Sequence, residues 1–256
     1  MPRSIRVTIF CEHNQDRREP VKSVYPDGIH GALAAAFPED ESFAVTIATQ
    51  DMPEHGLTEE VLSNTDTLVW WSHLDNPIFD DAVAKRVCRH VVGRGMGFLV
   101  LHSSTFSKPW QWIMGIAYDA GLWGRFRTMP KGEKERLWLV NPGHPIADGI
   151  GPYVEIPRDE MYGEPMLIPE PDQTIFLGWW EGGEANRAGC VFFRGRGKIF
   201  MFTPGHEAFP IFYQPEIQKI LRNAARYLAP SETINPGVFS GQYLDNTPLE
   251  DLSHRK

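Results

Sequence analysis

The chain has little cysteine, and its cysteines lie far apart. Cys11, Cys88 and Cys190 are the three cysteines among 256 residues, and no two of them form a Cys-x-x-Cys pair. An odd number of widely spaced cysteines indicates neither a disulfide framework nor a thiolate zinc site. We therefore expect all three thiols to stay reduced.

Positive charge and long apolar runs are also scarce. The 25 lysines and arginines are outnumbered by 33 aspartates and glutamates, which gives a net charge of -8, whereas nucleic-acid binding requires a basic surface. No apolar run approaches the roughly 18 residues of a membrane span, and the chain enters a strand without a charged and apolar leader. We expect no nucleic-acid partner, no membrane partner and a cytoplasmic location.

Strand-like and helix-like segments alternate along most of the chain. Short apolar runs predict strands at residues 5–11, 43–48, 67–71, 98–101, 174–179, 189–194 and 198–203. Segments with a helical period lie between several of these runs and begin at residues 29, 58, 80 and 216. This alternation predicts an α/β domain with right-handed βαβ crossovers, a mostly parallel sheet and helices on both faces.

Two segments depart from this alternation. Residues 108–173 are rich in proline, glycine and tryptophan without a helical period, which predicts a loop-rich insertion covering one end of the sheet. Residues 231–256 contain turn and charged residues without a period, which predicts an extended C-terminal arm. We therefore expect one α/β domain over residues 1–230, and an arm that would suit exchange between the protomers of a homo-oligomer.

Polar side chains follow the predicted strands at the points where these end. The set consists of Glu12, His73, His102, Ser103, His206 and Glu207. Because the carboxyl ends of parallel strands lie at one edge of a sheet, where ligands bind, we expect these side chains to converge on one pocket. His30, at the start of a predicted helix, is a further candidate because a helix N-terminus favours neutral imidazole.

The histidines admit three interpretations. Neutral imidazoles are ligands for zinc, manganese or a similar divalent ion, and the candidate ligands are His30, His73, His102 and His206. Alternatively, His102, His206 and Glu207 could act as general acid and base on a bound substrate without a metal. In the third interpretation each residue only caps a strand or bonds a nearby carbonyl group.

A short segment combines acidic and aromatic residues between prolines. Residues 158–169 include Tyr162 and Glu164, and such a loop could close over a polyhydroxylated ligand, with Glu164 as a catalytic carboxylate. An acidic surface loop is the alternative. Trp71 and Tyr162 could form a stacking wall for a sugar ring, with Ser103 and Glu12 as further contacts, although large aromatic residues usually fill cores.

Several longer motifs occur in a characteristic order. They are YPDGIHGAL (25–33), VWWSH (69–73), GRGMGFLVLHSSTFSKPW (93–110), GHPIADGI (143–150), DEMYGEP (159–165) and KIFMFTPGHEAFP (198–210). Together they resemble the trehalose-utilisation ThuA family, from residue 5 to about residue 228. The resemblance implies the class I glutamine amidotransferase-like fold, a flavodoxin-like sheet with inserted elements.

The resemblance also bears on chemistry. The amidotransferase superfamily carries a nucleophilic cysteine after a central strand, and here His102 and Ser103 stand at or beside that position. Without a thiolate we expect no glutamine amidotransferase activity. In WWSHLDN the sequence has Asn76 where the family pattern often has a second histidine, which weakens a metal site built on both histidines.

The function that the resemblance implies is carbohydrate catabolism. We expect an enzyme that acts on trehalose or a related, keto-disaccharide at a histidine-rich site with a divalent metal, zinc or manganese. No nucleotide cofactor is expected, and the expected partner is a small sugar. The alternative is a non-catalytic sugar-binding or regulatory protein on a degenerate amidotransferase scaffold.

Overall fold

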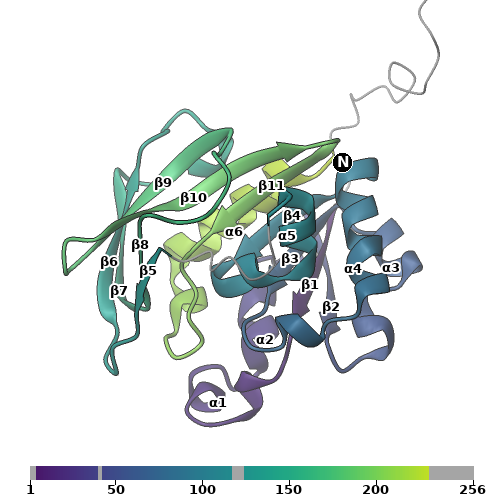
Figure 1. Ribbon diagram of the computed structural model, residues 1–256, viewed down its shortest axis with the longest axis horizontal. Coiled ribbons are helices and arrows are strands. Elements are labelled where there is room, and N and C mark those ends of the chain that lie inside the picture. Colours follow the sequence, from purple (N-terminus) through teal and green to yellow (C-terminus); the bar gives the residue numbers. More distant parts are fainter. Residues whose placement is uncertain (1–3, 40–41, 117–123, 231–256) are drawn as a thin grey trace, which may run out of the picture.

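The computed structural model describes residues 4–39, 42–116 and 124–230, which include most of the predicted domain (Figure 1). The predicted C-terminal arm, residues 231–256, lies outside the described residues. In the part of the chain that the structure describes, no helix combines the length and the apolar character needed to cross a membrane.

A nine-stranded sheet forms the centre of the molecule. Its strands, in spatial order, are β2 (Phe43–Thr49), β1 (Ile5–Cys11), β3 (Thr67–Trp71), β4 (Gly97–Leu101), β11 (Gly197–Phe202), β10 (Ala185–Arg194), β9 (Gln173–Trp180), β6 (Glu133–Leu139) and β7 (Tyr153–Asp159). The strands from β2 to β11 pair in parallel, and those from β11 to β7 pair antiparallel. The sheet therefore has a parallel half and an antiparallel half that meet at β11.

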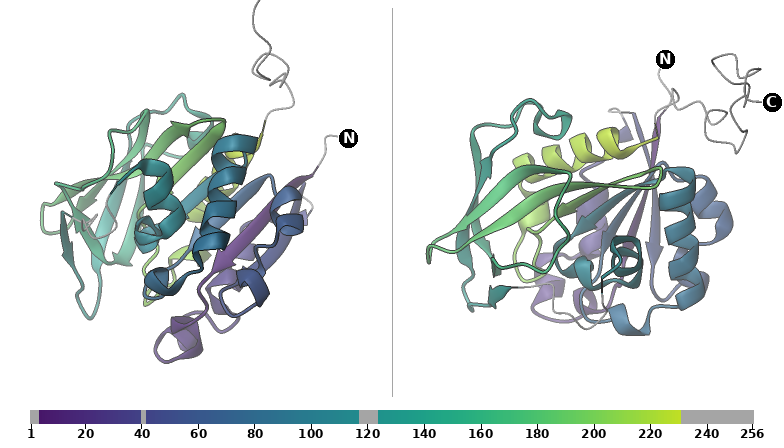
Figure 2. Two further views of the ribbon diagram at one scale, coloured as in Figure 1. Left: turned by 45° about the vertical axis from the view of Figure 1, so that its right-hand side comes forward. Right: turned by 45° about the horizontal axis from the view of Figure 1, so that its top comes forward.

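Helices cover both faces of the parallel half, as predicted (Figures 1 and 2). The helices are α1 (Val21–Val24), α2 (Gly28–Ala34), α3 (Glu59–Ser63), α4 (Asp81–Cys88), α5 (Lys108–Met114) and α6 (Pro215–Leu228). Apolar side chains of α2 and α6 pack on one face and those of α3, α4 and α5 on the other, which gives two hydrophobic cores separated by the sheet. A turn of π-helix, Arg89–Arg94, continues α4.

Strand β4 lies inside the parallel half, as suits a strand in which every residue is apolar or glycine. All five residues are buried, and the strand pairs with β3 on one side and β11 on the other. Gly97 has no side chain where α6 crosses the strand: a Cβ atom there would lie 2.6 Å from the Leu228 Cβ. The glycine therefore allows the helix to pack closely on the sheet.

The region expected to be a loop-rich insertion contains regular structure. Besides α5 it includes β6 and β7, which extend the sheet, and β5 (Arg125–Arg127) and β8 (Met161–Gly163), which form a separate two-stranded ladder. The sequence did not indicate β5, β6 and β7 because charged residues interrupt their apolar ones, and β8 is only three residues long. Arg136 of β6 pairs with Glu155 of β7 across the exposed face, at 2.8 Å. Antiparallel strands with one solvated face alternate polar and apolar residues and lack apolar runs.

Candidate active site

Three histidines from different strand ends face one another at the carboxyl edge of the parallel half. His73 follows β3, His102 follows β4, and His206 lies beyond β11. Their ring centroids are 6.2 Å apart for His73 and His102, 5.5 Å for His102 and His206, and 6.2 Å for His73 and His206. With Glu160 and Glu207 they form two overlapping sets of donor atoms within 4.8 Å of one another. We call His73, His102, Glu160, His206 and Glu207 the histidine cluster.

His102 is held from both sides of its ring. Its backbone adopts a left-handed conformation directly after β4, with φ of 51°, and its side chain is fully buried. Nδ1 lies 3.0 Å from the carbonyl oxygen of Thr203 and must donate a proton to it. Nε2 therefore faces the cluster, where it lies 2.9 Å from the hydroxyl of Tyr162, whose ring stacks on the imidazole at 4.9 Å.

Glu160 gives the cluster its negative charge. Its Oε2 lies 3.4 Å from Nε2 of His102 and its Oε1 lies 3.9 Å from Nε2 of His206, while Thr128 donates a hydrogen bond to Oε1. Burial lowers the pKa of His102, but the contact with Glu160 and the negative charges of Asp159 and Glu207 together outweigh it, so that the pKa is raised. Burial raises the pKa of Glu160, but His102 and Thr128 lower it to about 2. Each partner of the pair therefore favours the charged form of the other.

The other two histidines are neutral near neutral pH because burial lowers the pKa of both His73 and His206. Nδ1 of His206 accepts the backbone N–H of Ala208 at 3.1 Å, so neutral His206 carries its proton on Nε2. Ser103 donates its proton to the carbonyl of Ser72 and therefore accepts one from Nδ1 of His73 at 2.6 Å. This leaves a lone pair on Nε2 of His73.

Two buried carboxylates position the backbone around the cluster. Asp159 accepts the backbone N–H groups of Gly205 at 3.0 Å and of His206 at 3.2 Å, and burial raises its pKa to about 6. Glu12 accepts the backbone N–H groups of His73, Leu74 and Asp75 at 2.7 to 3.1 Å. Expected to contact a substrate, Glu12 instead holds the loop that begins with His73, because its two oxygens are occupied by these three donors.

Trp71 and Glu164 also differ from expectation. The side chain of Trp71 belongs to the hydrophobic core, is 1 % exposed, and donates from Nε1 to the carbonyl of Gly205 at 3.0 Å. A sugar ring therefore cannot stack on it in this conformation. Glu164 pairs with Arg187 of β10 through contacts of 2.7 and 3.1 Å and accepts two backbone N–H groups, so its carboxylate serves to hold β10 rather than to meet the histidines.

His30 lies in another group. His30 makes an ion-pair contact with Asp16, which also contacts His13. None of these three residues belongs to the histidine cluster. Burial and the neighbouring His13 lower the pKa of His30. His30 is therefore grouped apart from His73, His102 and His206, because the loop after β1 turns its helix toward a separate carboxylate, and this arrangement does not support a metal shared by all four.

Glu160 is the site residue that the strand-end pattern of the sequence did not indicate. It lies between β7 and β8, which belong to the antiparallel half and to the separate ladder. Reasoning from parallel strand ends cannot place such a residue. The available signal was its place in the acidic and aromatic segment 158–169, three residues before Gly163.

The cluster has the donor chemistry of a site for a divalent metal. Tetrahedral zinc ligands at 2.0 to 2.2 Å from the ion lie about 3.4 Å from one another, and the contact between His102 and Glu160 has a length of 3.4 Å. Among the described residues, the Oε2 atoms of Glu160 and Glu207 are buried without a hydrogen-bond partner. A cation would satisfy either oxygen, because His73, His102 and Glu207 form one set of donor atoms that fits such an ion and His102, Glu160 and His206 form the other.

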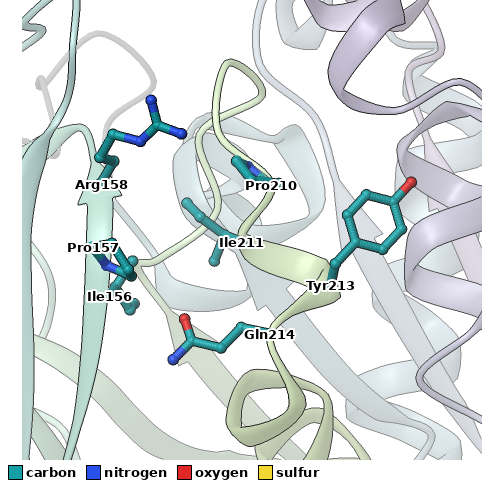
Figure 3. Close-up of a pocket in the computed structure, with 7 residues that line it drawn as sticks. All are labelled: Ile156, Pro157, Arg158, Pro210, Ile211, Tyr213 and Gln214. Carbon is teal, nitrogen blue, oxygen red and sulfur yellow. The ribbon is translucent and has the colours of Figure 1, made fainter.

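A cavity of about 340 Å³ lies near the cluster but is not part of it (Figure 3). Residues 156–158 of β7 line one side, and Pro210, Ile211, Tyr213 and Gln214 line the other. Arg158 immediately precedes Asp159, so the cavity adjoins the segment that carries Glu160. No member of the histidine cluster lines it, and its walls are largely apolar, which does not suit the recognition of sugar hydroxyl groups.

Comparison with known proteins gives one family. The family model described as ThuA, trehalose utilisation, matches residues 6–228, and no curated protein matches the chain. Similar solved structures include a ThuA-like protein from Parabacteroides merdae, with 14 % identity, a TM-score of 0.67, and coverage of 88 % of this chain and 90 % of that one. A ThuA-like protein from Bacteroides uniformis has 14 % identity, a TM-score of 0.61, and coverage of 87 % and 90 %.

A more distant likeness extends to a candidate GMP synthase protein from Thermoplasma acidophilum, with 11 % identity, a TM-score of 0.50, and coverage of 88 % of this chain and 94 % of that one. At these identities the solved structures establish the fold alone, and that fold agrees with the flavodoxin-like, amidotransferase-like architecture that the motifs implied. The family model, by contrast, covers most of the chain, and its limits enclose most of β1, the histidine cluster and α6. The chain belongs to the ThuA family, whose description is trehalose utilisation.

Proposed function

We propose that this protein is a sugar-processing enzyme that acts on trehalose or a related keto-disaccharide, with the histidine cluster as its active site. The observation that supports this most is the contrast in pKa within one buried group of side chains. The pKa of His102 is raised beside Glu160, whereas burial lowers the pKa of His73 and of His206. Neighbouring groups with pKa values moved in opposite directions are typical of acid and base catalysts.

The residues have distinct roles in this proposal. His102 holds a proton on Nε2, between the Tyr162 hydroxyl and Glu160, and can donate it to a sugar oxygen. His73 has a lone pair on Nε2 and can accept a proton. A keto sugar has an acidic C–H group beside its carbonyl, and neutral imidazole is a base of suitable strength to remove that proton near neutral pH.

The same residues would hold a divalent metal, zinc or manganese. The two sets of donor atoms, His73 with His102 and Glu207 and His102 with Glu160 and His206, supply imidazole nitrogen and carboxylate oxygen, the donor types that these ions accept. With an ion bound, Nε2 of His102 would lose its proton and serve as a ligand in place of an acid. A bound ion would polarise a carbonyl or hydroxyl oxygen of the sugar. Thr203 and Ser103 orient the rings of His102 and His73 through Nδ1, as partners of metal-bound histidines commonly do.

One observation favours the second candidate function, sugar binding without turnover. The side chain of His102 is fully buried and Ser103 is inaccessible as well. A substrate can reach His102 only if neighbouring side chains move. In a binding or regulatory protein His102 would instead stabilise the site without touching the sugar.

Turnover of sugars by matched variants tests the proposal. The wild-type protein is incubated with trehalose and with its keto derivative, with and without Zn²⁺ or Mn²⁺, and products are followed by NMR. We expect His102→Gln to lower kcat at least 100-fold, because proton transfer by a positioned side chain contributes about 10²- to 10⁴-fold. Binding of either sugar by a wild-type protein that does not convert it would favour the second candidate.

The control is His90→Gln. His90 is also buried and contacts a glutamate, Glu59, at 2.9 Å, but it lies where β4 begins rather than where it ends. We expect this variant to keep its turnover. Equal turnover by His102→Gln and the wild-type protein would contradict the proposed mechanism, and the absence of both binding and turnover in the wild-type protein would contradict both candidate functions.

A further inference from the structure

The segment between β1 and α2 lies at the bottom of Figure 1, and with the first turn of α2 it carries a second group of side chains of the types that bind metals. His13 follows β1, Asp16 belongs to a turn of 3₁₀ helix, and His30 lies in the first turn of α2. Nδ1 of His13 lies 3.0 and 3.1 Å from the two carboxylate oxygens of Asp16, and Nδ1 of His30 lies 3.8 Å from Oδ2. These three side chains are distinct from the histidine cluster.

Asp16 is fixed at the centre of this group. Its side chain is 1 % exposed, and Oδ2 accepts the backbone N–H of Ile29 at 3.1 Å. In the described part of the chain, the basic groups within ion-pair distance of Asp16 are His13 and His30. A buried carboxylate requires a nearby positive charge or metal for stability, and two imidazoles supply full compensation only when protonated or when they share a cation with it.

The position of His30 is explained by a shared ion better than by a hydrogen bond. Its Nδ1 is buried and has no hydrogen-bond partner among the described residues, although it faces a carboxylate oxygen at 3.8 Å. That distance is too long for a hydrogen bond. Two ligands of one tetrahedral zinc ion lie about 3.4 Å apart, and the contacts here, 3.0 to 3.8 Å, lie on both sides of that value.

The local backbone is shaped around the same point. Gly28 has φ of +74°, and a Cβ atom there would lie 2.4 Å from Cε1 of His30 and 3.0 Å from Oδ2 of Asp16. His13 itself has φ of 53°, a left-handed conformation that is unfavourable for a residue other than glycine. Such strain is typically kept where a side chain must point in a functional direction.

We propose that His13, Asp16 and His30 form a second divalent-cation site, selective for zinc-class ions, with a coordination position open to solvent. The side chains of His13 and His30 are 26 % and 21 % exposed, which gives an ion access to the site. His13 also lines a cavity of about 280 Å³. Two imidazoles, one carboxylate and an open position are the arrangement of a zinc site that exchanges a ligand, whereas structural zinc sites have four protein ligands.

Zinc stoichiometry tests this site separately from the histidine cluster. Untagged protein is stripped with a chelator, dialysed against Zn²⁺, and analysed for metal by mass spectrometry. We expect His30→Ala to bind one equivalent less than the wild-type protein, and His102→Ala to retain that equivalent. If the histidine cluster binds no metal, the wild-type protein binds one equivalent, His30→Ala none and His102→Ala one, so the two sites fail or succeed independently.

A second pair of variants keeps the test valid if His30→Ala folds poorly. His13→Gly removes a ligand and relieves the left-handed backbone, and we expect it to lose the same equivalent of zinc. His55→Gly is its control, since His55 also has a left-handed backbone, with φ of 54°, but bonds the carbonyl of Gln50 in place of a carboxylate. Wild-type stoichiometry in folded His30→Ala or His13→Gly would overturn the proposal, as would a loss in His55→Gly equal to that in His13→Gly.

Discussion

His102 shows how one residue can be set for proton transfer by partners that are distant in the sequence. The carbonyl of Thr203 fixes a proton on Nδ1, so that only Nε2 changes its protonation state. Tyr162 and Glu160 then surround Nε2 with an oxygen acceptor and a negative charge. The left-handed backbone after β4 is the conformation that brings the ring into this position.

The first prediction concerns pH and stability. The folded-state pKa of His102 lies above its ordinary value of 6.5, so the charged ring stabilises the fold below that pH, and this contribution is lost as the pH rises through the folded-state pKa. The pKa of Glu160 lies below its ordinary value of 4.5, at about 2, so its contribution is present above pH 4.5 and is lost as the pH falls toward 2.

Unfolding by urea in the presence of a chelator measures this effect. We expect the difference in the free energy of unfolding between the wild-type protein and His102→Gln to be largest between about pH 4.5 and 6.5 and to decrease above that window. His90→Gln serves as the control for the loss of a buried histidine. A difference that is constant or increases from about pH 6 to pH 9 would show that His102 is neutral.

At the scale of elements, the loops that follow the strands are held in place by carboxylates from neighbouring strand ends. Three backbone N–H groups of the loop after β3 converge on Glu12 after β1, and Asp159 at the end of β7 holds the turn after β11. His73 and His206 are thus each positioned by a carboxylate from another strand. The strands are held in register by their backbone pairing, and the crossing of α6 over β4 leaves no room for a side chain at Gly97.

Gly97→Ala tests that crossing. A Cβ atom would approach the carbonyl oxygen of Leu228 to 2.8 Å, and backbone cannot easily move away. We expect the variant to lose about 1 to 3 kcal/mol of unfolding free energy, the usual cost of overpacking a core, as measured by urea unfolding at fixed pH. Gly143→Ala is the matched control, because a Cβ atom at Gly143 would have no neighbouring atom within 4 Å, and it should change stability by less than about 0.5 kcal/mol.

At the scale of the whole molecule, the protein combines an amidotransferase-like fold with cysteine thiols that are buried or half-buried. Cys11 and Cys190 are buried, and Cys88 is half-buried. Burial raises the pKa of all three thiols, to about 11 for Cys88 and about 12 for Cys190. The thiolate, which is the nucleophile in amidotransferase chemistry, is therefore scarce at neutral pH.

We expect the protein to release no ammonia from glutamine, and iodoacetamide to leave its sugar turnover unchanged near neutral pH. Ammonia production and thiol modification, the latter by mass spectrometry, are the measurements. Unfolded protein in urea supplies the control, because its exposed thiols should be alkylated quickly. Rapid alkylation of the folded protein, or ammonia release that depends on His102, would contradict this prediction.

The sequence by itself determined the parallel half of the sheet and the order of the residues that end its strands. The predicted segments 67–71 and 98–101 correspond to β3 and to four of the five residues of β4. Strands buried on both faces require continuous apolar runs, and such runs can be recognised locally. His73, His102 and His206 could be selected for the same reason, because the carboxyl ends of parallel strands share one edge.

Only the tertiary structure decided the partners of these residues. Glu160, which follows β7, and Tyr162 of the short ladder strand β8 reach His102 from about 60 residues further along the chain, and such short or partly solvated strands leave a weak signal in the sequence. Trp71 and Glu12 are residue types that often bind sugars. In the structure, however, Trp71 donates a hydrogen bond to the carbonyl of Gly205, and Glu12 accepts hydrogen bonds from the loop after β3. The contact between His30 and Asp16 depends on the path of the loop between β1 and α2. Side-chain pairing across such separations is set by packing and electrostatics in three dimensions, which local patterns do not record.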